Sequence, residues 1–291
     1  MKFIKYLLGE FGKLLRTKFK FNFSQSIYRR LSFNDSFTFQ VNDRNICMHS
    51  LCSVSNDIFY SGIYGNYEGH SLRIWNHLCM NVKDSYVFDI GGYSGAYSLV
   101  AASANHEVKI HTFEPHPNTF RILKKNIDSN AFDNIYIHNF ALSLSDGDIT
   151  FYNSVGHAPS GFSSINHKYI SRDAGTLVCK AKDISRLLDT NYKDKRISLM
   201  KLDIERAELP LLQQIISRLI NDSTCILCEI LDEESYQEFD ILFTMNGYKS
   251  IQVDDNNKKA IEVNNLKDAK KIGRNVVFIP ENQDTEDIIK L

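Results

Sequence analysis

The chain has 291 residues, of which 43% are hydrophobic and 24% are charged, and its formal net charge is -1 at pH 7. This length and composition predict a globular protein with one large domain, and the near-neutral charge gives no general attraction to nucleic acid. Six cysteines are scattered through a chain too large to need disulfide staples, and no secretory signal precedes them. We therefore expect reduced thiols and a cytoplasmic location.

The first thirty residues contain eight basic residues and a single acid, Glu10. Apolar residues recur among them at helical spacing, which predicts a basic amphipathic helix. Lysines interrupt the apolar residues too early for a signal-peptide core or a membrane span. Two roles stay open: packing on the domain or on a partner, which is favoured, and peripheral contact with anionic lipid at the inner membrane surface.

Residues 31–80 carry short aromatic and polar runs, such as residues 37–41, that suggest strands and turns. We expect them to form a cap ahead of a nucleotide-binding unit. Within this cap, residues 64–68 either line the cofactor or acceptor pocket or form an ordinary surface turn. The chain is therefore divided into an N-terminal helix and cap, residues 1–80, and a catalytic domain, residues 81–291.

From residue 85 onward, strand and helix patterns alternate, which predicts an α/β fold with a doubly wound sheet of about seven strands. The predicted strands are 87–90, 108–113, 135–142, 197–202, 224–230, 248–253 and 275–279, and the predicted helices are 96–104, 118–127, one around 212–219 and 236–245. Added strands at 148–152 and 177–181 flank a polar loop, residues 154–164, which we expect to be a lid or an acceptor-binding loop.

Cys225 and Cys228 have the spacing of a metal-binding knuckle. They lie inside an apolar run, however, where a strand would point the two sulfurs to opposite faces. Packing in the core is therefore the favoured interpretation.

A glycine turn follows the first core strand. The strand ends in Asp89, the turn contains Gly91, Gly92 and Gly95, and the next strand ends in Glu114, 19 residues past Gly95 (114 - 95). A separation of roughly 20 residues places an acid on a ribose hydroxyl. The glycine spacing differs from that of dinucleotide sites, and a carboxylate at Asp89 would repel a pyrophosphate but attract an ammonium group, which favours S-adenosylmethionine. Alternatively, Asp89 caps the helix that begins near Gly95.

A second group of acids follows the strand 197–202. Strand alternation predicts that Lys201, Asp203 and Glu205 point to the same side at its carboxyl end, where ligands collect in open α/β sheets. A helix must begin just afterward, so a structural role suffices for Glu208. We expect Asp203 or Glu205 to accept the acceptor proton, with Lys201 setting the local potential. A variant of this mechanism places a divalent metal between Asp203 and Glu229.

These segments, in this order, resemble the FkbM-type methyltransferases. The resemblance covers roughly residues 85–280 and is carried by residues 87–91, 113–117, 123–126, 139–143, 201–208 and 275–280. It implies a class I, Rossmann-like fold, S-adenosylmethionine as cofactor, and O-methylation of a sugar, glycan or other small hydroxylated acceptor, as in polysaccharide modification. On the family pattern the cofactor-binding residues are Asp89, Gly91, Gly92, Tyr93 and Gly95 for the methionine part, Glu114 with Pro115 for the ribose, and Asn139 and Ala141 for the adenine.

Two positions depart from this pattern. Tyr93 stands where the family usually has asparagine, and Arg206 replaces the glycine usual between the acids. Arginine there either recognises an anionic acceptor or neutralises the acids and weakens activity. A catalytically weak binding or scaffold module is therefore the alternative to an enzyme. A nicotinamide oxidoreductase is disfavoured by the glycine spacing, and a nucleic-acid methyltransferase by the lack of an Asn/Asp-Pro-Pro-Tyr element after the fourth strand.

Overall fold

The computed structural model describes residues 2–19, 24–28, 35–153, 163–164, 175–232, 234–269 and 272–291. The loop expected over residues 154–164 lies outside the described residues except for its last two.

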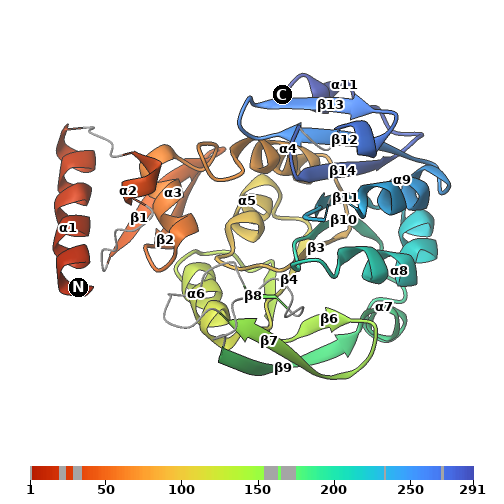
Figure 1. Cartoon of the computed structure of the whole chain (residues 1–291), viewed down its shortest axis with the longest axis horizontal. Coiled ribbons are helices and arrows are strands. Elements are labelled where there is room, and N and C mark those ends of the chain that lie inside the picture. Colours follow the sequence, from red (N-terminus) through yellow and green to blue (C-terminus); the bar gives the residue numbers. More distant parts are fainter. Residues whose placement is uncertain are drawn as a thin grey trace.

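An eight-stranded sheet forms the centre of the molecule (Figure 1). Its strands lie in the order β13 (Lys259–Val263), β12 (Tyr248–Asp254), β14 (Asn275–Pro280), β11 (Cys225–Glu229), β10 (Ile197–Leu202), β3 (Tyr86–Ile90), β4 (Lys109–Phe113) and β5 (Ile135–His138). The five strands from β11 to β5 are parallel, whereas β14 runs antiparallel to both of its neighbours. The doubly wound sheet is confirmed, with eight strands instead of about seven because β13 extends one edge as a hairpin with β12.

Helices cover both faces of this sheet, which buries the parallel strands on two sides. One face packs against α4 (Gly69–Met80), α5 (Ala96–Ala104) and α6 (Pro117–Asp128), and the other against α7 (Ile184–Asn191), α8 (Glu208–Asp222) and α9 (Tyr236–Thr244). Successive strand residues alternate between the two cores, as Val87 and Phe88 do. Two short helices, α10 (Leu266–Ala269) and α11 (Glu286–Ile289), complete the C-terminal part.

Strand alternation also places the side chains of Cys225 and Cys228 in different cores. Cys225 packs in the core beside α4 and α5, and Cys228 packs in the opposite core beside α8 and α9. Both side chains are buried, and all six cysteines of the chain are free. Core packing is therefore confirmed for this pair.

A smaller sheet pairs β6 (Ala141–Ser143), β9 (Gly175–Asp183), β7 (Gly147–Asn153) and β8 (Ser163–Ser164) in that order. The prediction of one strand over 135–142 was wrong, because β5 and β6 belong to different sheets. Asn139 lies at the break, and its side-chain amide donates to the carbonyl oxygens of Glu114 and Pro115 at 2.9 and 3.1 Å. This local bonding replaces strand pairing at the point where the chain leaves the central sheet.

The N-terminal part contains α1 (Lys2–Phe19), α2 (Gln25–Tyr28), a hairpin of β1 (Ser36–Val41) and β2 (Arg44–His49), α3 (Ser53–Ser61) and α4. The amphipathic helix and the strand near 37–41 are confirmed, but the prediction of strands and turns was wrong for α3 and α4. Leu72, Trp75 and Cys79 recur at helical spacing and are fully buried against the core that also holds Val87. The division of the chain at residue 80 stays a prediction.

Candidate active site

A cavity of about 1140 Å³ opens where β3, β4, β10 and β11 have their carboxyl ends. Segments far apart in the sequence line it: residues 66–68, the turn after β3, the loop after β10 and residues 255–256. This is the edge at which open α/β sheets bind ligands. The lining residues that sequence reasoning had selected are Gly91, Tyr93, Glu114, Pro115, Ala141, Asp203, Glu205 and Glu229.

The glycine turn is held between β4 and the loop after β10. The backbone N–H groups of Gly91 and Gly92 both donate to the carbonyl oxygen of Phe113, at 3.0 and 3.1 Å. Gly91 has a left-handed φ of 87°, and a Cβ atom there would lie 1.9 Å from the carbonyl oxygen of Asp203. Only glycine satisfies both conditions, so the turn brings bare backbone to the cavity.

Glu114 lies beside this turn, as its sequence spacing predicted. The side chain is 7% exposed; its Oε2 accepts a hydrogen bond from the Tyr93 N–H at 3.1 Å, and its Oε1 accepts one from the His116 N–H at 2.8 Å. Burial raises the pKa of Glu114 to about 7. Asn139 is exposed and is not a lining residue in the described structure; it braces the Glu114–Pro115 backbone instead.

Asp89 contacts the helix that the sequence offered as its alternative partner. It is fully buried and is not a lining residue in the described part of the chain. Its Oδ2 accepts a hydrogen bond from the Ser98 hydroxyl at 2.5 Å, and the carboxyl also accepts one from the Ser98 backbone N–H in the first turn of α5. Gly95, with φ 85°, is the N-cap residue of that helix. This geometry fits a helix cap, and the expected contact between Asp89 and the cofactor stays a prediction.

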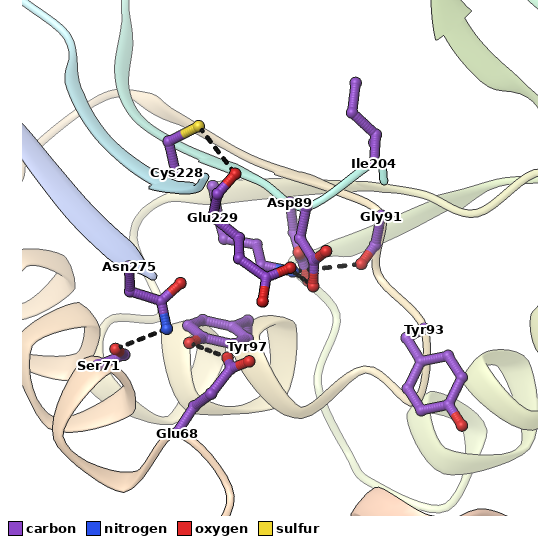
Figure 2. A network of polar contacts seen from close by, with 12 residues as sticks. Glu68, Ser71, Asp89, Gly91, Tyr93, Tyr97, Ile204, Cys228, Glu229 and Asn275 are labelled. Carbon is purple, nitrogen blue, oxygen red and sulfur yellow. Dashed lines mark hydrogen bonds and ion pairs between the residues drawn. The ribbon is translucent and has the colours of Figure 1, made fainter. Parts of the chain in front are cut away.

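A buried lysine connects the turn to the acids of the cavity. Lys201 Nζ lies 3.3 Å from both the Asp203 Oδ2 and the Gly91 carbonyl oxygen, and 4.8 Å from the centre of the Tyr97 ring. Tyr97 in turn donates its hydroxyl to Glu68 Oε2 at 2.7 Å, and Figure 2 shows Glu68 beside the Tyr97 ring. Burial opposes the charge of Lys201, but Asp203 and other nearby carboxylates raise its pKa above the ordinary value. Lys201 is therefore a fixed cation at the base of the site.

Three carboxyl groups meet at the ends of β10 and β11. Burial and the negative charge of Asp203 raise the pKa of Glu229 well above its ordinary value, and Glu229 hydrogen-bonds to Asp203. Glu229 is therefore neutral at pH 7 and donates its proton toward Asp203. Burial and Asp203 also raise the pKa of Glu205, to about 7. In the described residues no group of three or more His, Cys, Asp or Glu side chains has the arrangement of a metal site, so the Asp203–Glu229 metal variant stays a prediction.

The predicted alternation required the strand to continue through Glu205, but β10 ends at Leu202 and a loop follows it. Glu205 and Arg206 have left-handed backbones, with φ of 58° and 80°. Glu208 closes the loop, because its Oε1 accepts hydrogen bonds from the backbone N–H groups of Ile204 and Arg206 at 2.8 and 3.3 Å. Glu205 thus reaches the cavity through the turn of this loop, and Glu208 has the structural role that was allowed for it.

Other lining residues come from outside the motifs. Asn66, Tyr67 and Glu68 line the cavity, as the pocket option for residues 64–68 expected, whereas Tyr64 and Gly65 are not among its described lining residues. What binds beside them stays a prediction. Asp255 had no distinguishing signal in the sequence. Its Oδ1 accepts hydrogen bonds from the backbone N–H groups of His70 and Ser71, at 2.9 and 2.8 Å, and thereby satisfies the first turn of α4. Only the folded chain brings these two segments together.

A comparison with protein families matches the segment that contains most of the candidate active site. Residues 89–251 match the model of the methyltransferase FkbM domain. The match begins at Asp89, includes the loop after β10 and covers more than half of the chain. The chain belongs to this family. Its central sheet has the class I methyltransferase fold, and membership implies S-adenosylmethionine as the methyl donor.

Individual relatives of this FkbM-domain protein are distant. "Methyltransferase 1" of Beauveria bassiana (strain ARSEF 2860) is 26% identical over 144 residues, which cover 45% of this chain and 58% of that protein. The aligned part thus spans less than two thirds of that relative. The crystal structure of methyltransferase FkbM from Methylobacillus flagellatus KT has a TM-score of 0.41 and 11% identity, covering 68% of this chain and 43% of that one. The human methyltransferase 10 domain containing protein has a TM-score of 0.42 and 11% identity, covering 94% and 95%.

The two departures from the FkbM pattern share a backbone conformation. Tyr93, with φ 44°, and Arg206, with φ 80°, both occupy the left-handed region. Asparagine and glycine tolerate this region, whereas other residues cost about 1–2 kcal/mol there. The Arg206 Nε donates to Asp232 Oδ1 at 2.7 Å, and Asp203 is ion-paired with Lys201. Arg206 therefore holds the neighbouring loop through Asp232 and leaves the Asp203–Lys201 pair intact.

Proposed function

We propose that the protein transfers the methyl group of S-adenosylmethionine to a hydroxyl group of a sugar, a glycan or another small hydroxylated acceptor. The observation that carries the proposal is a single cavity that joins the glycine turn and Glu114 to the carboxyl groups of Asp203, Glu205 and Glu229. Its volume is slightly larger than that of ordinary ligand pockets, which leaves space for a nucleoside cofactor and a second small molecule.

The residues around the turn fit the cofactor. S-adenosylmethionine supplies a methyl group on a positively charged sulfur. Gly91 exposes backbone without a side chain, Glu114 offers carboxylate oxygens to ribose hydroxyls, and Ala141 and Pro115 provide small apolar surface for a base. The acids of the cavity favour a cation, because several carboxyl groups share a space from which water is partly excluded. A dinucleotide pyrophosphate would be repelled by the same groups.

The acids then divide the chemical work. Asp203 is held in place by Lys201 at 3.3 Å and by a hydrogen bond with the protonated Glu229. Glu205 has a pKa of about 7, close to the optimum for a general base at neutral pH. We therefore assign the removal of the acceptor proton to Glu205 and the positioning of the acceptor to Asp203. This assignment chooses between the two residues that the sequence left open.

The acceptor part of the cavity carries hydrogen-bonding groups suited to several hydroxyls. Asn66, Asp255, Asn256 and Asn275 line it together with Tyr67. Carboxylates accept hydrogen bonds from sugar hydroxyls, amides both donate and accept them, and an aromatic ring packs on the apolar face of a sugar. This lining supports a polyhydroxylated acceptor over a flat apolar one.

The test incubates the purified chain with S-adenosylmethionine and a panel of glycans, glycolipids and small alcohols, and measures release of S-adenosylhomocysteine. We expect turnover with a hydroxylated acceptor and a loss of about a hundredfold or more in the Glu205→Gln variant, with cofactor affinity retained. Glu238→Gln, an exposed acid on α9, is the matched control and should have normal turnover. A chelator should leave the rate unchanged; inhibition would favour the metal variant. Tight cofactor binding without turnover across the panel would support the binding-module alternative instead.

A further inference from the structure

The N-terminal helix α1 exposes a continuous apolar face. Leu7, Leu8, Phe11 and Leu14 are 50%, 51%, 54% and 42% exposed, respectively. Their positions follow the spacing i, i+1, i+4 and i+7, which places all four side chains on one side of the helix. We refer to these four residues as the outer face of α1. Large apolar side chains gathered in this way mark an interaction site more often than scattered ones do.

The opposite side of α1 is the one turned toward the protein. Gly9 and Gly12 are buried, and Lys13 forms an ion pair with Asp35, just ahead of β1. Figure 1 shows α1 at the rim of the molecule, beyond α2 and the β1–β2 hairpin. The helix is therefore held by its small and polar side, and the outer face points into solvent. These four apolar side chains do not pack on the described part of the domain, and packing on a partner and contact with anionic lipid both stay predictions.

The charge of α1 indicates what covers this face. The helix contains five basic residues and Glu10, a net charge of +4 (5 - 1), whereas the whole chain has a formal charge of -1. The remaining residues thus carry a net charge of -5 (-1 - 4), which is opposite in sign to that of α1. In the sequence, Lys20, Arg29 and Arg30 extend it. A second copy docked through the same face would bring two helices of like net charge together, which is unfavourable, whereas an anionic surface is attracted.

We propose that the outer face of α1 docks the protein on a bilayer that contains anionic lipid. The four apolar side chains enter the headgroup and acyl boundary, and the net positive charge of α1 attracts the anionic headgroups. Within the described residues no helix has the length and apolar character needed to cross a bilayer, so α1 lies in the plane of the interface. The enzyme would then act on acceptors presented at that surface. The docking itself does not depend on the proposed methyl transfer.

The experiment is vesicle co-sedimentation of the full chain. Vesicles of phosphatidylcholine mixed with phosphatidylglycerol are compared with vesicles of phosphatidylcholine alone, and the salt concentration is varied. The Phe11→Glu variant places a charge in the outer face, and Thr17→Glu adds the same charge at an exposed position of α1 outside that face. We expect binding to the anionic vesicles that weakens with salt, a loss of at least about tenfold for Phe11→Glu, and a change of at most about threefold for Thr17→Glu.

Three results would overturn the proposal. The first is equal binding to neutral and anionic vesicles, and the second is equal affinity of the two variants. The third is a dimer of the wild-type chain in light scattering that Phe11→Glu dissociates, because the outer face would then belong to a second copy. Thermal unfolding and cofactor affinity are measured for both variants. Unchanged values there mean that a loss of vesicle binding comes from α1 and leaves the methyltransferase question separate.

Discussion

Replacing Gly91 by alanine introduces one methyl group at the point where the turn after β3 meets the loop after β10. The new Cβ would lie 1.9 Å from the Asp203 carbonyl oxygen, and an ordinary van der Waals contact needs at least 3.4 Å, so backbone must move by about 1.5 Å (3.4 - 1.9). Neither side can yield easily, because the N–H of Gly91 is bonded to Phe113 and the N–H of Asp203 to Ile90. The steric conflict is therefore between two anchored backbones.

The expected cost has two parts. A non-glycine residue at φ 87° costs about 1–2 kcal/mol, and overpacking of a rigid contact costs about 1–3 kcal/mol more, which together lower the free energy of unfolding by about 2–5 kcal/mol. A displacement of about 1 Å at a reacting centre costs on the order of a hundredfold in rate. We therefore expect Gly91→Ala to lose at least that much activity and to bind the cofactor weakly.

Gly247→Ala provides the control for backbone strain alone. Gly247 has φ 74°, and a Cβ there would meet nothing within 4 Å, so only the cost of about 1–2 kcal/mol applies. Urea unfolding and calorimetric titration with S-adenosylmethionine would be measured on both variants. If Gly91→Ala is as stable as Gly247→Ala and binds the cofactor normally, the close-approach argument for the turn is refuted.

Substitutions at three positions probe β10 and the loop that follows it. The rate should rise with pH through about 7, because Glu205 must lose its proton to act as a base, and Glu205→Gln should abolish this limb of the pH profile while leaving cofactor affinity unchanged. Arg206→Gly should change the free energy of unfolding by less than about 0.5 kcal/mol, since relief of the left-handed strain offsets the lost pair with Asp232. Arg206→Ala keeps the strain and should be less stable than Arg206→Gly by about 1 kcal/mol. Equal stabilities of the two variants in urea would contradict the strain assignment. Lys201→Met should destabilise the fold by about 3–5 kcal/mol at pH 7, because it leaves buried carboxylates uncompensated. The raised pKa of Lys201 means that its stabilisation is fully present below about pH 10, and the deficit of Lys201→Met should shrink in acid, where carboxyl groups are protonated. A deficit that does not vary with pH would point to packing instead.

Many helices and strands could be predicted from the local sequence, because apolar periodicity follows burial directly. The helix at 96–104 and the strand at 197–202 have the predicted bounds, since each is a buried segment whose residues alternate or recur without interruption. The glycine turn was also predictable, because Gly91 and Glu114 are placed by the short-range geometry of a single strand–helix–strand unit. Apolar periodicity did not predict the break after His138, where the side chain of Asn139 hydrogen-bonds to the backbone of Glu114.

In the candidate active site, too, some features could be predicted from the sequence and others only from the tertiary structure. The sequence by itself determined which residues stand at the carboxyl ends of β3, β4 and β10, because the order of strands and acids lies within the chain. Tertiary structure alone decided that Asp89 caps α5, that Glu205 reaches the cavity through a left-handed loop, and that Asp255 meets α4. It also decided that the apolar face of α1 points outward. A pattern specifies which side of an element is apolar, whereas packing energies summed over the whole molecule decide what that side faces.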